Sequence, residues 1–186
     1  MRVIVPSDEV SRISADLWLQ LVKLGEVRVP FEVIGPTSYM LLYALRLLSK
    51  WQEIELHVDT KSGDEVSFEA AKELKRRKLA GQQTTVYVDG CAHSIGLSYV
   101  APGTHRVATP TSTFLAHGDQ ERVRRSSLRH ANGSLMEDHY IADWLAQFTL
   151  RTYDEWLEFV SDGEYHKFGA EQAREWGVID EIREGV

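Results

Sequence analysis

Ser94 lies in a turn bracketed by glycines, directly after a strongly β-branched stretch that is expected to form a buried strand. The turn reads Gly90-Cys91-Ala92-His93-Ser94-Ile95-Gly96. A serine at a tight strand-to-helix turn exposes its hydroxyl, and the backbone N–H of Ile95 is then free to bind an oxyanion. The same pattern also fits a serine that only caps the helix beginning near Ile95. The local sequence therefore suggests a nucleophile and leaves the capping role open.

A nucleophilic serine needs a base within hydrogen-bond reach, usually a histidine that a third group orients. Among the seven histidines, His117 is the best candidate because it closes the apolar strand expected over 113–116. Catalytic residues often lie where a rigid strand meets a loop. His93 adjoins Ser94 but is expected, as a sequence neighbour, to point away from it as a structural or pocket residue. A structural or surface role is also common for a histidine in the position of His117.

The chain contains no motif for binding a metal ion or a cofactor. There is no HExxH pattern and no cluster of cysteine and histidine, so no metal site is predicted. Serine chemistry of this kind needs no organic cofactor either. The single cysteine, Cys91, cannot form an intrachain disulfide, which fits a cytoplasmic location. The start of the chain lacks the features of a signal peptide, and no apolar run approaches the roughly 18 residues of a membrane span, so a soluble protein is expected.

The charge balance argues against a nucleic-acid partner. The chain has 21 basic and 28 acidic residues and a net charge of −7, whereas a non-specific nucleic-acid binder needs a basic face. The one basic cluster is expected to be a solvated loop or an intersubunit contact; it comprises Arg122, Arg124, Arg125 and Arg129. With 186 residues and 43% hydrophobic content, the chain suits one domain, 1–186.

Expected strands and helices alternate along the chain. Strands are predicted over 27–34, 53–58, 84–88, 107–108, 113–116 and 178–180. Helices are predicted over 14–25, 38–50, 68–79, from 97 onward, 134–149, 152–160 and 170–176. Capping boxes at Ser134 to Glu137 and at Thr152 to Glu155 open two of these helices. The alternation predicts an α/β fold with a mostly parallel sheet and right-handed crossovers.

One long segment resembles the active-site region of the proteolytic subunit of the Clp protease. Residues 90–118 read GCAHSIGLSYVAPGTHRVATPTSTFLAHG, and in that family a glycine-flanked serine and a histidine after a Pro-x-Ser-containing strand follow at this separation. The likeness extends from about Phe31 to Ile182, and the stretch AEQAREWGVIDEI is similar to the family's closing helix and strand. It implies a ClpP/crotonase-like superhelix of repeated βαβ units with a protruding, helix-containing handle. The head would span about 27–117 and 161–186, and the handle about 118–160.

The resemblance also implies roles for individual residues. Ser94 would be the nucleophile and His117 the base of a serine endopeptidase that works through an acyl-enzyme. The backbone N–H groups of Gly63 and Ile95 would form the oxyanion hole, although the family usually has paired glycines where this chain has Ser-Gly-Asp.

The family's orienting acid has no counterpart at its expected place. Counted from the two sides, that place falls on Tyr165 or on Gly163, and neither is acidic. Asp162 and Glu164 flank it and are alternative candidates for the acid that orients His117. Loss of that acid would slow the chemical step without removing the fold.

Partners follow from the same resemblance. The family works as rings that enclose the active sites, which implies a homo-oligomeric ring, two of them stacked, with peptides or unfolded proteins as substrates. An AAA+ unfoldase is implied for folded substrates, while a specialised relative would work without one. Two other functions remain open. One is a catalytically impaired ring subunit with an incomplete triad, and the other is a crotonase-type enzyme acting on acyl thioesters, which uses paired backbone N–H groups but usually has no serine at this place.

Overall fold

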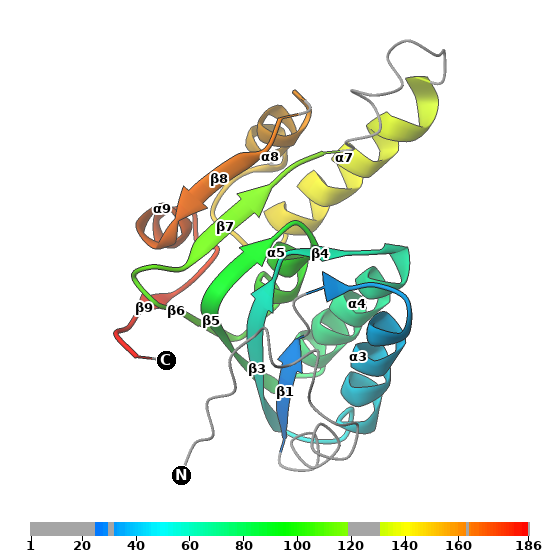
Figure 1. Cartoon of the computed structure of the whole chain (residues 1–186), viewed down its shortest axis with the longest axis vertical. Coiled ribbons are helices and arrows are strands. Elements are labelled where there is room, and N and C mark those ends of the chain that lie inside the picture. Colours follow the sequence, from blue (N-terminus) through cyan, green and yellow to red (C-terminus); the bar gives the residue numbers. More distant parts are fainter. Residues whose placement is uncertain (1–24, 30–31, 119–130, 163, 186) are drawn as a thin grey trace.

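The computed structural model describes residues 25–29, 32–118, 131–162 and 164–185. The predicted basic cluster lies outside these residues, and so does the predicted helix over 14–25, apart from Gly25. The fold is mixed α/β with a mostly parallel sheet, as the sequence predicts (Figure 1). Among the described residues, no helix combines the length and the apolar character that a membrane span requires.

The main sheet has seven strands, and β5 is its centre. Its strands are β1 (Glu26–Val29), β3 (Glu53–Thr60), β5 (Gln83–His93), β6 (His105–Ala108), β7 (Thr113–Ala116), β8 (His166–Gly169) and β9 (Glu181–Ile182). The first part of β5 pairs with β3 and β6, and its last residues pair with β7; all pairs are parallel except β7 with β8. A separate parallel pair joins β2 (Glu32–Val33) to β4 (Ser62–Gly63). Because β5 is shared in this way, its carboxyl end lies beside the end of β7.

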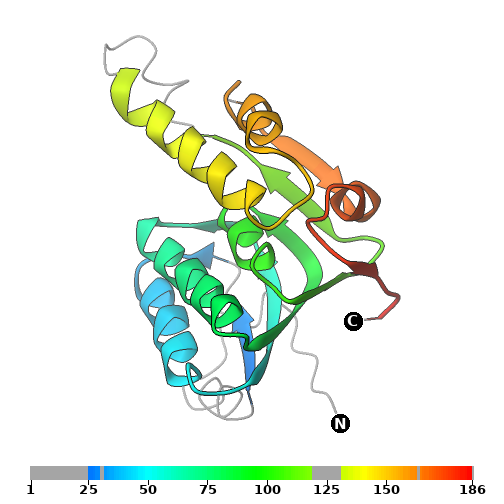
Figure 2. The same cartoon turned by 180° about the vertical axis from the view of Figure 1, so that it is seen from behind.

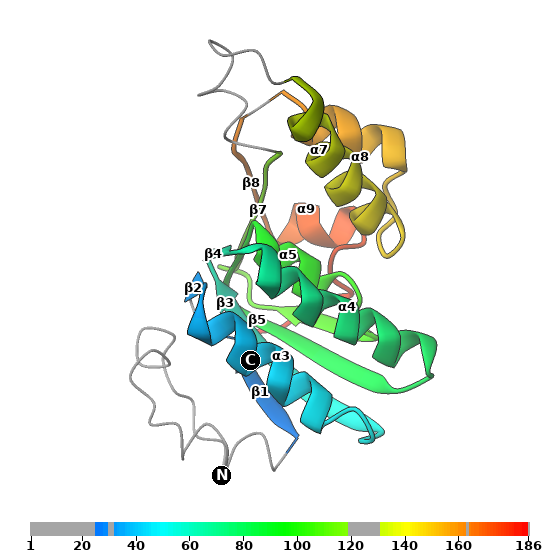
Figure 3. The same ribbon diagram turned by 90° about the vertical axis from the view of Figure 1, so that its right-hand side faces the viewer.

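Helices α3 (Pro36–Leu47), α4 (Glu65–Leu79) and α5 (Ile95–Val100) cover one face of the sheet (Figures 2 and 3). Their apolar residues, such as Leu41, Leu45 and Leu74, form the core with the strand residues Leu56 and Val88. Burial of each such side chain contributes about 1.5–3 kcal/mol. Helix α7 (Ala131–Ala146) projects away from the sheet with α8 (Tyr153–Val160) beside it, and α9 (Ala170–Glu175) packs near β8 (Figure 1).

Several local predictions are confirmed. The capping box at Thr152 is present, because its hydroxyl accepts from the N–H of Glu155 while the carboxylate of Glu155 accepts from the N–H of Thr152. Helix α8 therefore begins at Tyr153, within one residue of its predicted start. Gly177 follows the last turn of α9 at a φ of 69°, the left-handed conformation that favours glycine after a helix.

Four local predictions are wrong, and one strand has no prediction. The turn predicted over 90–96 is part of strand β5 as far as His93. Helix α7 begins at Ala131, so the residues from Ser134 lie inside the helix and do not cap it. The strand predicted over 27–34 is divided into β1 and β2. The C-terminal strand lies at 181–182, because the N–H groups of residues 178 and 179 bond to the carbonyl of Ala173 and close α9. Strand β8 was not predicted at all, since only Phe168 of its four residues is buried and no alternation is visible.

Candidate active site

Strands β5 and β7 bring Ser94 and His117 to the same edge of the sheet. The two strands run parallel with His93 opposite Leu115, and the N–H of Ser94 donates to the carbonyl of Leu115 at 2.8 Å. Residues that follow neighbouring parallel strands emerge side by side. The position of His117, two residues after Leu115, therefore follows from the register of the sheet.

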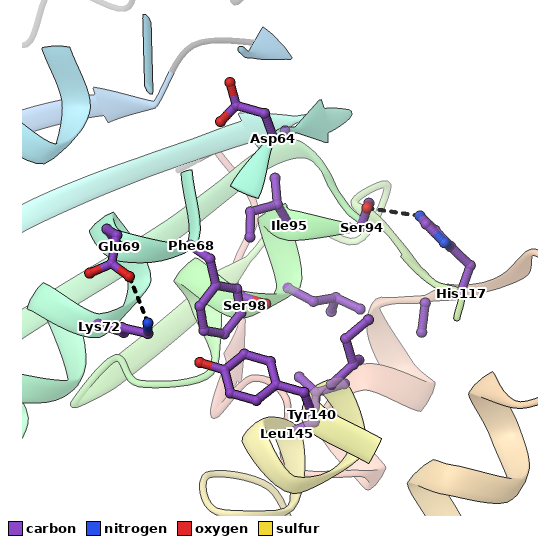
Figure 4. Close-up of a pocket in the computed structure, with 14 residues that line it drawn as sticks. Asp64, Phe68, Glu69, Lys72, Ser94, Ile95, Ser98, His117, Tyr140 and Leu145 are labelled. Carbon is purple, nitrogen blue, oxygen red and sulfur yellow. Dashed lines mark hydrogen bonds and ion pairs between the residues drawn. The ribbon is translucent and has the colours of Figure 1, made fainter. Parts of the chain in front are cut away.

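Ser94 has an unusual backbone conformation. Its φ of 54° and ψ of −116° make it the only non-glycine residue with positive φ in the described part of the chain. Such conformations cost about 1–3 kcal/mol and persist where the surrounding structure holds them. The Ser94 hydroxyl makes no capping bond to α5, so the structure disagrees with the helix-cap interpretation of this serine. The turn instead directs the hydroxyl toward His117 (Figure 4).

The imidazole of His117 lies between Ser94 and a backbone carbonyl. Its Nε2 is 2.8 Å from Ser94 Oγ, and its Nδ1 is 2.6 Å from the carbonyl oxygen of Gly118. A carbonyl oxygen can only accept a hydrogen bond. In the neutral ring the proton therefore lies on Nδ1, and Nε2 is left to accept the Ser94 O–H. This is the tautomer that a general base for serine requires.

The two acids considered for orienting His117 lie elsewhere. Both carboxylate oxygens of Asp162 are 2.9 Å from the ring Nε2 of His166, and Asp162 Oδ1 also accepts the N–H of Glu164 at 2.8 Å. These bonds, that of the Glu164 N–H first, lower the pKa of Asp162. The side chain of Glu164 is exposed and makes no hydrogen bond or ion pair with a described residue. Tyr165 lies against His117 instead, with ring centroids 5.1 Å apart.

Gly63 and Ile95 adjoin each other beside the serine. Ile95 is the first residue of α5, so its N–H has no acceptor within the helix. Gly63 approaches so closely that a Cβ added to it would lie 2.5 Å from Cγ2 of Ile95. Asp64 fixes this turn, because its carboxylate accepts from the N–H groups of Ser67 and Gly35 and from the hydroxyl of Ser38. Burial opposes ionisation of Asp64, but these bonds outweigh it and lower its pKa.

A cavity of about 430 Å³ opens beside Ser94 and His117 (Figure 4). It extends between α4 and α7, and several apolar side chains line it: Phe68, Ile95, Leu97, Ile141 and Leu145. Its far end holds Tyr140 and an ion pair in which Lys72 Nζ lies 2.6 Å from Glu69 Oε1. An apolar channel with few polar groups is the usual form of a site for an organic ligand.

The remaining reactive side chains near Ser94 are engaged elsewhere. His93 Nε2 lies 2.9 Å from Thr113 Oγ1, and burial, followed by nearby Lys167 and Lys61, lowers the pKa of His93. Burial, with a further contribution from Asp59, raises the pKa of Cys91 to about 12, so its thiol is a poor nucleophile near neutral pH. Within the described ranges, no three His, Cys, Asp or Glu side chains form a group suited to a metal ion.

Two features of the site have no signal in the sequence. The Gly118 carbonyl is a backbone group, which any residue type would supply. Asp138, on α7, is 1% exposed and packs against Gly118, yet it lies in a polar stretch of sequence that gives no sign of burial. The packing of α7 beside the end of β7 brings Asp138 to Gly118, the residue that follows His117.

The fold is that of the ClpP type, with its mixed α/β architecture and mostly parallel sheet. The solved structures include a mutant of ClpP1 from Listeria monocytogenes, which this chain matches with a TM-score of 0.71 over 91% of this chain and 96% of that chain. The sequence identity is 16%, so the likeness concerns the fold. No family model matches the sequence.

Proposed function

We propose that this protein is a serine endopeptidase in which Ser94 is the nucleophile and His117 the general base. The observation that carries the proposal is the 2.8 Å contact between Ser94 Oγ and His117 Nε2, made by a serine at positive φ. A nucleophile and a base within this distance, at the mouth of an apolar cavity, are what acyl transfer requires. The ClpP-type fold supports the choice of a peptidase among serine hydrolases.

In the proposed reaction, His117 Nε2 removes the Ser94 hydroxyl proton as Oγ attacks the carbonyl carbon of a peptide bond. The resulting tetrahedral intermediate collapses when the same proton passes to the leaving amine, which leaves an ester on Ser94. His117 then takes a proton from water as the water oxygen attacks this ester, and the proton passes to Ser94 Oγ as the acid leaves. The apolar cavity would take the side chain of the residue on the acyl side of the cleaved bond.

Backbone N–H groups would stabilise the negative oxygen of the intermediate. The free N–H of Ile95 at the start of α5 supports it as one donor. Gly63 is proposed as the second, because it adjoins Ile95 and lines the same cavity. Each donor of this kind contributes roughly 3–4 kcal/mol in known serine hydrolases.

A catalytically impaired ring subunit is the second candidate. One observation favours it: the acceptor at His117 Nδ1 is the carbonyl of Gly118 and not a carboxylate. A carbonyl fixes the tautomer but carries only a partial charge, so it stabilises the protonated ring less than a full negative charge would. The sequence-based candidates Asp162 and Glu164 would take the orienting role only after a shift of the 161–166 segment.

Assembly and partners remain proposals by analogy with the ClpP fold. We expect stacked homo-oligomeric rings joined through the handle that contains α7, a cytoplasmic location, and unfolded proteins or peptides as substrates. An AAA+ unfoldase would deliver folded substrates. No organic or metal cofactor enters the proposed reaction.

Hydrolysis of a fluorescently labelled, unfolded casein tests the proposed function. The wild-type protein should release internal peptides, identified by mass spectrometry, and Ser94→Ala should release none above background. Cys91→Ser is the matched control for the other nucleophilic side chain nearby and should retain full activity. A wild type that is folded and oligomeric but inactive would favour the impaired subunit.

A further inference from the structure

The acceptor for the Nδ1 proton of His117 is held in place by two helices. Gly118 is buried, and a Cβ added to it would overlap with Oδ1 of Asp138 on α7 and with the carbonyl oxygen of Val160 at the end of α8. Gly118, whose carbonyl accepts from His117, therefore fits between these helices with no room for a side chain. Any movement of Asp138 or Val160 would move the carbonyl on which the orientation of the imidazole depends.

Asp138 is the only acidic residue among the buried residues of the described ranges, with 1% exposure. Burial of a carboxyl group costs free energy. A buried carboxyl group therefore persists where neighbouring groups compensate for that cost. Asp162, the candidate from the sequence, is exposed and bonds to His166. The acidic group that packs against Gly118 is on α7, far from the sequence position where the family's acid is expected.

We propose that Asp138 is a positioning residue for His117 and acts through the Gly118 peptide. Its side chain packs against Gly118 and so keeps the carbonyl of that residue at Nδ1, and its negative charge beside Gly118 stabilises the ring when it accepts the Ser94 proton. Charges act more strongly across a buried site than across water. Asp138 thus supplies part of what a carboxylate in direct contact supplies in a complete triad. This inference rests on the proposed role of His117 as base.

The test replaces Asp138 with asparagine, which keeps the shape and removes the charge. The rate of Ser94 modification by a fluorophosphonate probe should fall about 10- to 100-fold. This is the range seen when a group that orients a metal-binding histidine is removed. Asp143→Asn is the matched control, because Asp143 is an exposed aspartate on the same helix; its labelling rate should stay within about twofold. Melting temperatures are measured for both variants.

A second readout separates positioning from a merely structural role. In protein labelled with ¹⁵N-histidine, the Nδ1 proton of His117 should give a low-field NMR signal, because it is held in a 2.6 Å hydrogen bond. We expect Asp138→Asn to shift this signal upfield or to abolish it, and Asp143→Asn to leave it unchanged. An unchanged signal in a folded Asp138→Asn protein would overturn the inference, whether or not labelling slows.

The signal also distinguishes failure of the inference from failure of the proposed function. If the wild type does not react with the probe, the peptidase proposal fails, but the NMR signal still reports whether Asp138 orients His117. If Asp138→Asn does not fold, Asp138→Ser is measured in the same way. Wild-type labelling and an unshifted signal in that variant would likewise contradict the role of Asp138.

Discussion

At its amino end, β5 accepts hydrogen bonds from Arg77 of α4. At its carboxyl end, it places Ser94 beside a cavity. Arg77 is 3% exposed, and its guanidinium donates to the carbonyls of Leu48, Trp51 and Gln83 and to the hydroxyl of Thr84. Burial lowers its pKa, and the backbone acceptors compensate for the missing carboxylate.

The carboxyl end of the same strand has the opposite character. Ser94 has a strained backbone, Gly63 is packed against Ile95, and an open cavity lies alongside. One end of β5 thus has hydrogen-bonded polar groups, whereas the other end leads to the Ser94 hydroxyl and the Ile95 N–H, which are placed for chemistry. Changes at the first end should reduce stability, and changes at the second should reduce the rate of reaction.

The largest effect is expected from Ser94→Ala. Removal of the nucleophile should lower peptide hydrolysis by at least about 1000-fold, since the remaining groups cannot form the acyl-enzyme. The variant should keep the melting temperature of the wild type within a few degrees, as measured by circular dichroism. Addition of His117→Ala to Ser94→Ala should lower the rate no further, because the two act as a unit; a further loss would contradict their coupling.

At the other end of β5, Arg77→Met should lower the free energy of unfolding by about 3 kcal/mol, because the buried carbonyls lose their donors. Chemical denaturation measures this change. The rate of hydrolysis per folded molecule should stay close to that of the wild type. Arg76→Met is the control, since Arg76 is an exposed neighbour on α4, and should cost less than about 0.5 kcal/mol. If Arg77→Met and Arg76→Met lowered the free energy of unfolding equally, the stabilising role of the amino end of β5 would be contradicted.

Gly63→Ala should slow the reaction and lower the free energy of unfolding by about 1–3 kcal/mol. The added methyl would meet Cγ2 of Ile95 at 2.5 Å and the hydroxyl of Ser67 at 2.6 Å, so the proposed oxyanion donors must separate. We expect a rate about 10- to 100-fold lower, below or near the full cost of one donor. Gly169→Ala, where a Cβ meets nothing within 4 Å, is the matched control. Unchanged hydrolysis in Gly63→Ala would exclude Gly63 from the oxyanion hole.

The smallest effect concerns pH and Asp64. Its pKa is lower in the folded protein than the ordinary value of 3.8, because hydrogen bonds to the carboxylate outweigh burial. A lowered pKa contributes stability that is present above the unfolded value and is lost as pH falls through the folded value. Denaturation should thus show a fall in stability below about pH 4. The fall should be shallower in Asp64→Asn, and an identical slope would show that Asp64 contributes nothing to it.

The parallel sheet could be anticipated from the sequence, because β-branched strands are local signals. The pairing of Ser94 with His117 could be anticipated only through the resemblance to the Clp family, since the local patterns also fit a helix cap and a structural histidine. Strand β7 was predicted over its full length, 113–116. Helix ends are less accurate: α7 begins at Ala131 although a capping pattern begins at Ser134. Strand β8 is specified by its pairing with β7, which no local pattern records.

The orienting group could not be predicted, because it depends on packing between distant elements. Counting from known motifs led to Asp162 and Glu164, which lie close in sequence to the family's position. The structure directs Asp162 to His166 and presents the carbonyl of Gly118 to His117. A backbone acceptor leaves no trace in residue types, and the burial of Asp138 depends on where α7 passes the end of β7.

Activation of Ser94 by His117 is tested most directly by labelling with a fluorophosphonate probe and mapping the modified peptide. We expect one adduct per chain, located on Ser94, and its rate of formation should fall at least about 100-fold in His117→Ala. A folded wild type that remains unlabelled, or that is labelled equally well without His117, would contradict the assignment of Ser94 and His117 as nucleophile and base.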